Sequence, residues 1–158
     1  MRIAIVVPFL DEVEALPATL AQAVREVAAY ADAEVIAVDG GSADASRAVA
    51  AAHPFVRVEA AARGRATQMN AGAAAATGDV LLFLHADTLL PDGALAAIAA
   101  AAAEPAFVYG GFRHRFSGTD WRLRAISALH NFRCRITGNY YGDQAMFVRH
   151  ELFQQVSG

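Results

Sequence analysis

The sequence contains no lysine and only one cysteine. The single cysteine excludes two kinds of structural feature. All 13 basic side chains are arginine, which together with the excess of alanine we interpret as genomic base-composition bias rather than chemistry. Because Cys134 is the only cysteine, an internal disulfide bond and a cysteine-based zinc site are both excluded. The lack of disulfide bonds favours a reducing compartment.

The sequence also lacks basic tracts, a signal peptide and a membrane-spanning run. A formal net charge of -3 without a dense cluster of arginines argues against nucleic acid as the main partner. Met1 leads directly into the apolar run 3–7, which leaves no room for a signal peptide. The longest weakly polar stretch, residues 93–111, is interrupted at Glu104-Pro105 and predicts helix, turn and strand rather than a membrane span. We therefore expect a cytoplasmic protein.

What is present is a regular alternation of short apolar runs and helical patterns. The runs predict strands at residues 3–7, 34–38, 56–59, 80–84, 107–112 and 144–148. Helices are expected at residues 16–30, 44–53, 64–77, 92–103 and 121–136. Such strand–helix units predict an α/β fold with a mostly parallel central sheet and right-handed crossovers. No linker or repeat divides the 158 residues, so we expect a single domain over residues 1–158.

Three helix ends have candidate capping residues. Ser42 or Asp44 is expected to cap the second helix and Asp120 the last one. Gly78 is well placed to end the third helix, since glycine adopts the left-handed conformation that follows many helices.

The apolar run at residues 80–84 ends in His85-Ala86-Asp87. A carboxylate where a buried parallel strand leaves the sheet lies at the edge at which open α/β sheets bind ligands. Asp87 can hold a divalent cation there, and the alternative is a structural role in capping the turn that follows. Mg²⁺ or Mn²⁺ suits a site with so few carboxylates, whereas zinc needs more ligands. We count His85 and Ala86 among the residues that contact the same bound ligand.

The second predicted strand also ends in an acid, in the segment Asp39-Gly-Gly-Ser-Ala-Asp44. Its two glycines allow a tight turn and the close approach of a ligand. A nucleoside fits such a crevice, with Asp39 accepting a hydrogen bond from the base imide or a ribose hydroxyl. The alternative is that Asp39 only shapes the turn. For Asp44, a capping role is favoured over function.

The first predicted strand ends in Pro8-Phe-Leu-Asp11-Glu12. Either carboxylate can reach the same crevice from the adjacent strand, and both are counted as nucleotide-sugar-binding residues. The alternative is a solvated acid in the first turn of a helix.

Two arginines and two amides lie shortly before and within the helix expected at residues 64–77. They occur in the segment Arg63-Gly-Arg65-Ala-Thr-Gln68-Met-Asn70. Guanidinium groups and helix N-terminal amides together suit phosphate oxygens. Arginines in a loop are more often solvated than functional. The interpretation as a phosphate-binding segment therefore depends on the acids expected at the neighbouring strand ends. We expect Arg65 and Asn70 to bind the diphosphate.

These segments together resemble the family 2 glycosyltransferases of the GT-A fold. The similar segments are VVPFLDE, EVIAVDGGSAD, GRATQMNAGAAAATGDVLLFLHADT and YGDQAMFVR, and in this order they cover nearly the whole chain. VDGGSAD, GRATQMN and FLHADT are especially similar to a bacterial subgroup found near radical-SAM and selenium-related genes. The resemblance implies a Rossmann-like three-layer sandwich. It also implies an inverting transfer of a sugar from a nucleoside-diphosphate sugar to an acceptor hydroxyl.

The resemblance further implies roles for individual residues. Pro8, Glu12 and Asp39 would line the nucleoside pocket, and Asp87 would be the metal-binding acid of the family's Asp-x-Asp motif. This chain carries His85 at the first position of that motif. It therefore departs from the family where an aspartate would contact ribose or metal.

Inversion by direct displacement needs one general base near the acceptor hydroxyl. Asp143 is the only acid in a plausible place for this role. Relatives in the family usually carry a Glu-Asp pair after a Gly-Gly-Phe-like turn, and the chain ends at Gly158, about where that turn would begin. We therefore expect a chain truncated at its C-terminus that transfers sugar poorly or not at all. Asp143 then either serves as the base or orients the acceptor.

The helix expected at residues 121–136 is amphipathic and basic. It combines Trp121, Ile126, Leu129 and Phe132 with four arginines. Such a helix can rest on an anionic membrane, which suits a lipid-linked acceptor at the inner face of the membrane. The alternative is a helix packed on its own domain with its arginines in water.

Three other functions are weighed against sugar transfer. A nucleotide-binding module without turnover would bind the same donor and metal but transfer no sugar. A sugar nucleotidyltransferase is disfavoured because the glycine-rich, arginine-containing N-terminal loop that it needs is absent. A dinucleotide oxidoreductase is disfavoured because no Gly-x-Gly-x-x-Gly follows the first strand.

Overall fold

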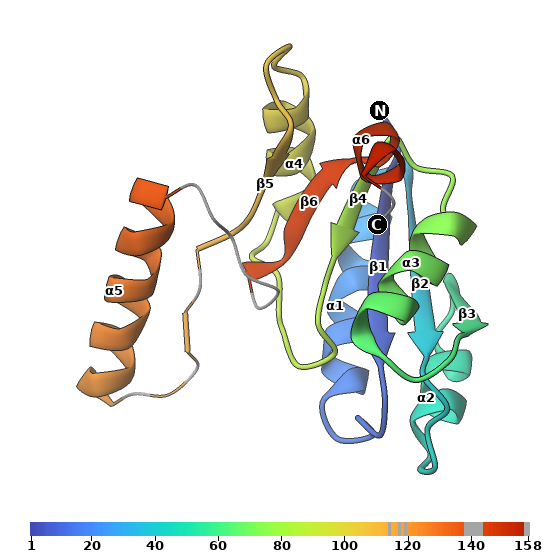
Figure 1. Ribbon diagram of the computed structural model, residues 1–158. Helices are drawn as coiled ribbons and strands as arrows, with labels where there is room; N and C mark the ends of the chain where they lie inside the picture. The colour runs from blue at the N-terminus through green and yellow to red at the C-terminus, as the bar shows by residue number, and fades with distance from the viewer. Residues whose placement is uncertain (114, 117, 119, 138–143, 157–158) are drawn as a thin grey trace.

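The computed structural model describes residues 1–113, 115–116, 118, 120–137 and 144–156. These residues form a six-stranded sheet in the order β3-β2-β1-β4-β6-β5 (Figure 1). The strands are β1 (Ile3–Phe9), β2 (Ala33–Asp39), β3 (Val56–Ala60), β4 (Val80–Phe83), β5 (Tyr109–Gly110) and β6 (Met146–Arg149). The strands β3, β2, β1 and β4 are parallel, and β6 runs antiparallel to both of its neighbours. The predicted mostly parallel α/β sheet is therefore confirmed.

Helices cover both faces of the sheet and give three layers. They are α1 (Leu16–Ala29), α2 (Ser46–Ala52), α3 (Arg65–Ala75), α4 (Ala94–Ala102), α5 (Trp121–Thr137) and α6 (His150–Gln155). Helices α1 and α4 pack on one face, against alternate residues of β1 such as Ile5 and Val7. Helices α3 and α6 pack on the other face, against Val6 and its neighbours. Because both faces are covered, every residue of β1 is buried, as the continuous apolar run predicts.

The prediction that Gly78 ends the third helix is wrong. Helix α3 already ends at Ala75, and its C-cap residue Ala76 is extended. A Cβ atom on Gly78 would lie 2.7 Å from the backbone nitrogen of Ala4, so this glycine serves a close approach between two segments of backbone.

The capping predictions are confirmed in part. For α2 the predicted cap residue is wrong, since the N-cap position is held by Ala45. Asp44, one residue earlier, still accepts the Ser46 N–H through its Oδ1 at 2.9 Å. Asp120 Oδ1 accepts the Arg122 N–H at 2.9 Å at the start of α5, as expected.

The strand expected at residues 107–112 is much shorter than predicted. Only Tyr109 and Gly110 pair with β6 as a strand at this edge of the sheet. On either side of them there are only single backbone hydrogen bonds, from the Arg149 N–H to the Val108 carbonyl at 3.4 Å and from the Phe112 N–H to the Gln144 carbonyl at 2.7 Å. The ring of Phe147 in β6 lies directly against Gly110, where a Cβ atom would come within 2.6 Å of it. A short edge strand also limits pairing with other chains.

Helix α5 stands away from the sheet, at the left of Figure 1. The side chains of Ser127 and Cys134 face inward, where Ser127 Oγ accepts the Phe116 N–H at 3.4 Å and Cys134 Sγ donates to Gln144 Oε1 at 3.3 Å. Within the described ranges, no helix combines the length and apolar character needed to cross a membrane.

Candidate active site at the carboxyl ends of β1, β2 and β4

The site lies beside β1, where the chain stops adding strands on one side of the sheet and begins to add them on the other. From β1 the chain continues to β2 and β3 on one side, and then crosses over to β4 on the other side. Strands β1 and β2 end together, with Phe9 paired to Asp39, whereas the last pair of β1 with β4 is Val6 with Phe83. Ligands of open α/β sheets bind in the crevice at such a switch point. Pro8 is buried just beyond the last β1–β4 pair, where a missing N–H breaks no bond between these strands.

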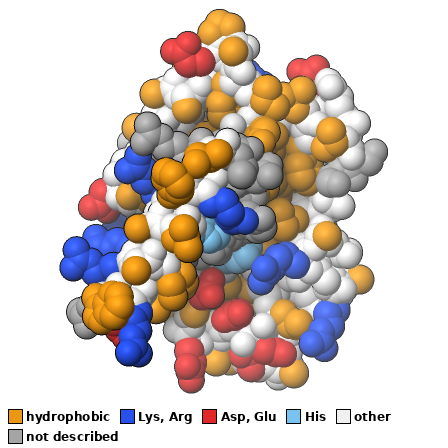
Figure 2. Space-filling view, turned by 60° about the vertical axis from the view of Figure 1, so that its left-hand side comes forward, with side chains coloured by type: hydrophobic (Ala, Val, Ile, Leu, Met, Phe, Trp, Pro, Cys, Tyr) orange, Lys and Arg blue, Asp and Glu red, His pale blue; other side chains and the backbone are white. Residues whose placement is uncertain are grey.

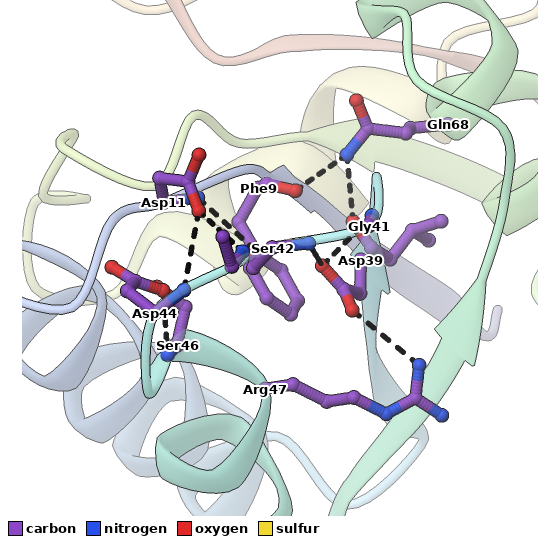
Figure 3. A network of polar contacts seen from close by, with 11 residues as sticks. Phe9, Asp11, Asp39, Gly41, Ser42, Asp44, Ser46, Arg47 and Gln68 are labelled. Atoms are coloured by element: carbon purple, nitrogen blue, oxygen red, sulfur yellow. Dashed lines mark hydrogen bonds and ion pairs between the residues drawn. The ribbon is translucent and has the colours of Figure 1, made fainter.

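Asp39 shapes the turn after β2. It is 3% exposed, and its Oδ1 accepts the N–H of Gly41 at 3.2 Å and that of Ser42 at 2.8 Å (Figure 3). Its Oδ2 accepts a hydrogen bond from Arg47 Nη1 at 3.4 Å. Gly41 has a positive φ of 91°, which a residue with a side chain would adopt only with strain. The turn role considered for Asp39 is therefore observed, and a contact with a nucleoside stays a prediction.

The surroundings of Asp39 keep its carboxylate charged. Burial raises the pKa of Asp39, but hydrogen bonds from the backbone and side chain of Ser42, from Arg47 and from Gly41 together lower this pKa below its ordinary value of 3.8. Asp39 is thus held in its charged, acceptor-only form at neutral pH.

Asp11 ties the loop after β1 to the loop after β2. Its Oδ1 accepts the N–H groups of Ala43 at 2.7 Å and Asp44 at 3.4 Å, and its own N–H donates to Ser42 Oγ at 3.1 Å (Figure 3). Asp11 adopts a φ of 54°, a conformation that aspartate tolerates better than most residues. Its observed contacts are therefore with the neighbouring loop, and its expected contact with a nucleotide stays a prediction.

Glu12 differs from Asp11 in having an unengaged carboxylate. Its backbone N–H donates to Ser46 Oγ at 2.8 Å, which fixes the position of Glu12 in the loop before α1 against the start of α2. Among the residues that the structure describes, none forms a hydrogen bond or ion pair with the Glu12 side chain, which is half-buried. Of the two acids after β1, Glu12 is thus the one that keeps its carboxylate available to a ligand.

Gln68 holds the ends of β1 and β2 together. Its side chain is 4% exposed, and its Nε2 donates to the carbonyl of Phe9 at 2.6 Å and to that of Val38 at 2.9 Å (Figure 3). The side chain also lies against Gly40, where a Cβ atom would come within 2.9 Å of its Cδ. Gln68 therefore holds two strand ends in place, and its side-chain N–H groups are directed at backbone carbonyls rather than at a phosphate. The sequence offered only a weak signal for this role, a glutamine one turn into a helix of small residues.

Arg65 and Asn70 are placed at the same edge through this contact of Gln68. Arg65 is the first residue of α3, and Gly64 before it has a φ of 139°. The side chains of Arg63, Arg65 and Asn70 are exposed. In the described part of the chain no residue forms a hydrogen bond or an ion pair with any of these three side chains. The two arginines are therefore available to an anionic ligand.

Asp87 lies in the loop after β4. Its carboxylate is exposed, and Oδ1 accepts a hydrogen bond from Thr88 Oγ1 at 3.3 Å. The preceding residues are more enclosed, since Ala86 is 5% exposed and His85 is half-buried. No three His, Cys, Asp or Glu side chains of the described residues come together in a way that could hold a metal ion. One exposed carboxylate fits Mg²⁺ or Mn²⁺, which bind through one or two carboxylates together with the phosphates of a substrate.

The structure thus brings four groups of predicted residues to one edge of the sheet: the end of β1, the turn after β2, the start of α3 and the loop after β4. Asp143, the predicted base, lies outside the described residues.

Comparison with known proteins shows similarity over nearly the whole chain. The family model described as glycosyl transferase family 2 matches residues 4–154. An undecaprenyl-phosphate 4-deoxy-4-formamido-L-arabinose transferase of Sodalis glossinidius (strain morsitans) is 30% identical over 159 residues, which cover 94% of this chain and 48% of that protein. The chain therefore spans about half the length of the curated relatives that it matches.

Solved structures of glycosyltransferases have the same fold. The mannosyltransferase PcManGT from Pyrobaculum calidifontis, in complex with GDP-Man and Mn²⁺, superposes with a TM-score of 0.75 at 20% identity over 99% of this chain and 47% of that one. TarS 1-349 of S. aureus in complex with UDP-GlcNAc gives a TM-score of 0.70 at 17% identity over 99% of this chain and 48% of that one. The expected GT-A fold is confirmed, and the chain belongs to glycosyl transferase family 2.

Proposed function

We propose that residues 1–158 form one nucleotide-sugar-binding domain of an inverting glycosyltransferase, which moves a sugar from a nucleoside-diphosphate sugar to an acceptor hydroxyl with Mg²⁺ or Mn²⁺. The observation that carries this proposal is the exposed, nearly unengaged carboxylate of Asp87 beside a topological switch point. Relatives of the same fold that hold GDP-Man with Mn²⁺, or UDP-GlcNAc, support it.

In this proposal the nucleoside lies over the ends of β1 and β2. Pro8 forms an apolar wall, and Glu12 and Asp39 are the acceptors for the base or the ribose. Asp11 supports this pocket indirectly, because its carboxylate fixes the loop that carries Ser42 and Asp44.

The diphosphate lies between the start of α3 and the loop after β4. Arg65 and Asn70 would donate hydrogen bonds to phosphate oxygens, and Asp87 would hold the metal ion. When bound, the metal ion neutralises the charge that develops on the leaving diphosphate. His85 and Ala86 lie next to Asp87 and would contact the donor, with His85 in place of the family's first aspartate.

Inversion requires a base that removes the proton of the acceptor hydroxyl while the diphosphate leaves from the opposite side. We propose that Asp143, or an acid that follows residue 158 in a longer protein, has this role. The alternative is a nucleotide-binding module that lacks a base. The module binds the donor with metal but neither transfers nor hydrolyses the sugar.

The test of donor binding is a thermal-shift titration of the chain with UDP and with GDP, each with MnCl₂ or with EDTA. We expect at least one diphosphate to raise Tm, and to raise it further with Mn²⁺, because a ligand that binds only the folded state stabilises that state. Uridine and guanosine with MnCl₂ are the controls, since they lack the diphosphate that the metal bridges. No shift with either diphosphate would contradict the proposal.

The acceptor is proposed to be lipid-linked, in line with the undecaprenyl-phosphate sugar transferase among the relatives. Helix α5 would then lie on the inner face of the membrane. Its apolar stripe is made of residues spaced by four, four, three and four positions and thus on one side of the helix: Trp121, Ala125, Leu129, Phe132 and Ile136. The four large members are 61–72% exposed, with Trp121 at 71%, Leu129 at 72%, Phe132 at 61% and Ile136 at 68%.

The positive charge beside the apolar stripe favours an anionic lipid surface as the partner that covers it. Arg122, Arg124 and Arg133 are exposed beside the stripe, and α5 contains no acidic residue. In Figure 2, which brings this side of the molecule forward, hydrophobic and basic side chains lie side by side at the left and lower left, and acidic side chains gather at the bottom. Interfacial helices combine these features, an apolar face for the acyl boundary and cations for the headgroups.

Co-sedimentation with vesicles tests the membrane contact. We expect binding at low salt to vesicles of phosphatidylcholine with about 30% phosphatidylglycerol, and about tenfold weaker binding for Phe132→Ser, because burying a phenylalanine contributes about 1.5–3 kcal/mol. Phe55→Ser is the matched control, since Phe55 is 80% exposed outside α5. Equal binding of both variants, absence of binding by the wild type, or a dimer that buries the stripe would refute the contact.

The narrower assignment to the bacterial subgroup near radical-SAM and selenium-related genes stays a prediction, which the segments VDGGSAD, GRATQMN and FLHADT support. The cytoplasmic location stays a prediction as well.

A further inference from the structure

We infer that a row of buried polar side chains on α1 positions the loop that carries Asp87. The row, called the polar row below, consists of Thr19, Gln22 and Glu26, which are 1%, 8% and 7% exposed. A spacing of three and four residues places them on one side of the helix. The inference rests on the proposed function only in assigning the metal ion to Asp87.

Each member of the polar row binds backbone of the segment 86–95. Thr19 Oγ1 donates to the carbonyl of Ala86 at 2.7 Å. Gln22 uses both ends of its amide on one residue, since Oε1 accepts the Leu90 N–H at 2.6 Å and Nε2 donates to the Leu90 carbonyl. Asp87 therefore lies between two anchored residues, one position after Ala86 and three before Leu90.

Glu26 anchors the far end of the same segment. Its Oε1 accepts the Gly93 N–H at 2.9 Å and its Oε2 accepts the Leu95 N–H at 3.3 Å. These amides belong to the start of α4, where a carboxylate is favoured by the free N–H groups and the helix dipole. The contacts advance along both segments in the same direction, so α1 holds the loop along its whole length.

The segment between β4 and α4 depends on these contacts because it has no regular backbone pairing of its own. Residues 84–93 contain neither helix nor strand, and yet Ala86 and Leu90 are buried, at 5% and 4% exposed. Buried backbone groups require partners, and here two side chains of α1 provide them. A loop fixed in this way holds the Asp87 carboxylate in one position before the metal ion and donor arrive, which lowers the cost of binding both.

Thr19 gives the cleanest test, because two substitutions separate its hydroxyl from its volume. Thr19→Val removes the hydroxyl with little change in shape, and Thr19→Ser retains it. We expect Thr19→Val to weaken manganese-dependent binding of UDP or GDP about tenfold, the range typical for residues that orient a metal ligand. Binding in EDTA should be unchanged, and Thr19→Ser should behave as the wild type.

A second readout does not depend on the nucleotide. Hydrogen exchange followed by mass spectrometry should show faster exchange in residues 86–95 of Thr19→Val, with exchange in β1 and β2 unchanged. Ile36→Val, a core change in β2, is the control for a general loss of stability and should alter neither the loop nor the response to manganese.

The outcomes separate the two proposals. Unchanged exchange in residues 86–95 would overturn the positioning role, and so would faster exchange that leaves the manganese dependence intact. If the wild type itself shows no response to manganese, the proposed function fails, while the exchange measurement still decides whether the polar row holds the loop.

Discussion

Asp87→Asn is expected to abolish the additional rise in Tm that Mn²⁺ gives in the presence of a nucleoside diphosphate, and to leave the metal-free rise in place. Asparagine keeps the shape of the side chain but removes the charge that a hard cation requires. A ligand at one hundred times its Kd stabilises the folded state by about 2.7 kcal/mol. For a domain of this size this corresponds to roughly 5–10 °C in Tm.

The fold itself should tolerate this change. Asp87 is exposed and its one hydrogen bond goes to its neighbour Thr88, so we expect the ligand-free stability to change by less than about 0.5 kcal/mol. Asp92→Asn is the matched control, an exposed acid five positions further along the same loop. A manganese response that survives in Asp87→Asn would remove Asp87 from the site, and an equal loss in Asp92→Asn would show that the effect is only one of net charge.

Much of the scaffold was predictable because its strands are buried on both faces. Continuous apolar runs such as those of β1 and β4 gave the positions of the strands within a few residues, and the acids at their ends followed from this. The antiparallel insertion of β6 between β4 and β5 could not be predicted. The four residues of β6 do not indicate which strand they pair with or in which direction they run. Both depend on contacts with β4, between residues more than 60 positions apart in the sequence.

The roles of the acids could be predicted only as a group. Asp11, Glu12 and Asp39 all follow predicted strands, but in the structure two of them accept backbone N–H groups and only Glu12 keeps a carboxylate free of described partners. This difference arises from how two loops meet, which local sequence does not encode. The buried amides were missed for the same reason, since Gln22 and Gln68 bind backbone 68 and 59 residues away, respectively.

Gly72→Ala is expected to destabilise the protein, although alanine is the better helix former. A Cβ atom at position 72 of α3 would lie 2.3 Å from Val6 Cγ1 and 3.0 Å from Val38 Cγ2. Val6 is fully buried in the central strand, and a β-branched side chain has little freedom to rotate away. Overpacking of this kind costs about 1–3 kcal/mol or more, against a gain of at most about 1 kcal/mol in helix propensity.

The net effect should appear as a lower midpoint in urea unfolding with an unchanged slope. Val6→Ala provides the complementary change, because it removes two of the three methyl groups that the new Cβ would meet, the closest one included, and leaves only Val38 Cγ2 at 3.0 Å. In the Val6→Ala background we expect Gly72→Ala to become neutral or stabilising, so that the double-mutant cycle gives a favourable coupling. A neutral Gly72→Ala in the wild-type background would mean that α3 does not approach the sheet this closely. The start of α3, with Arg65, would then be held at the carboxyl ends of β1 and β2 by the hydrogen bonds of Gln68 alone.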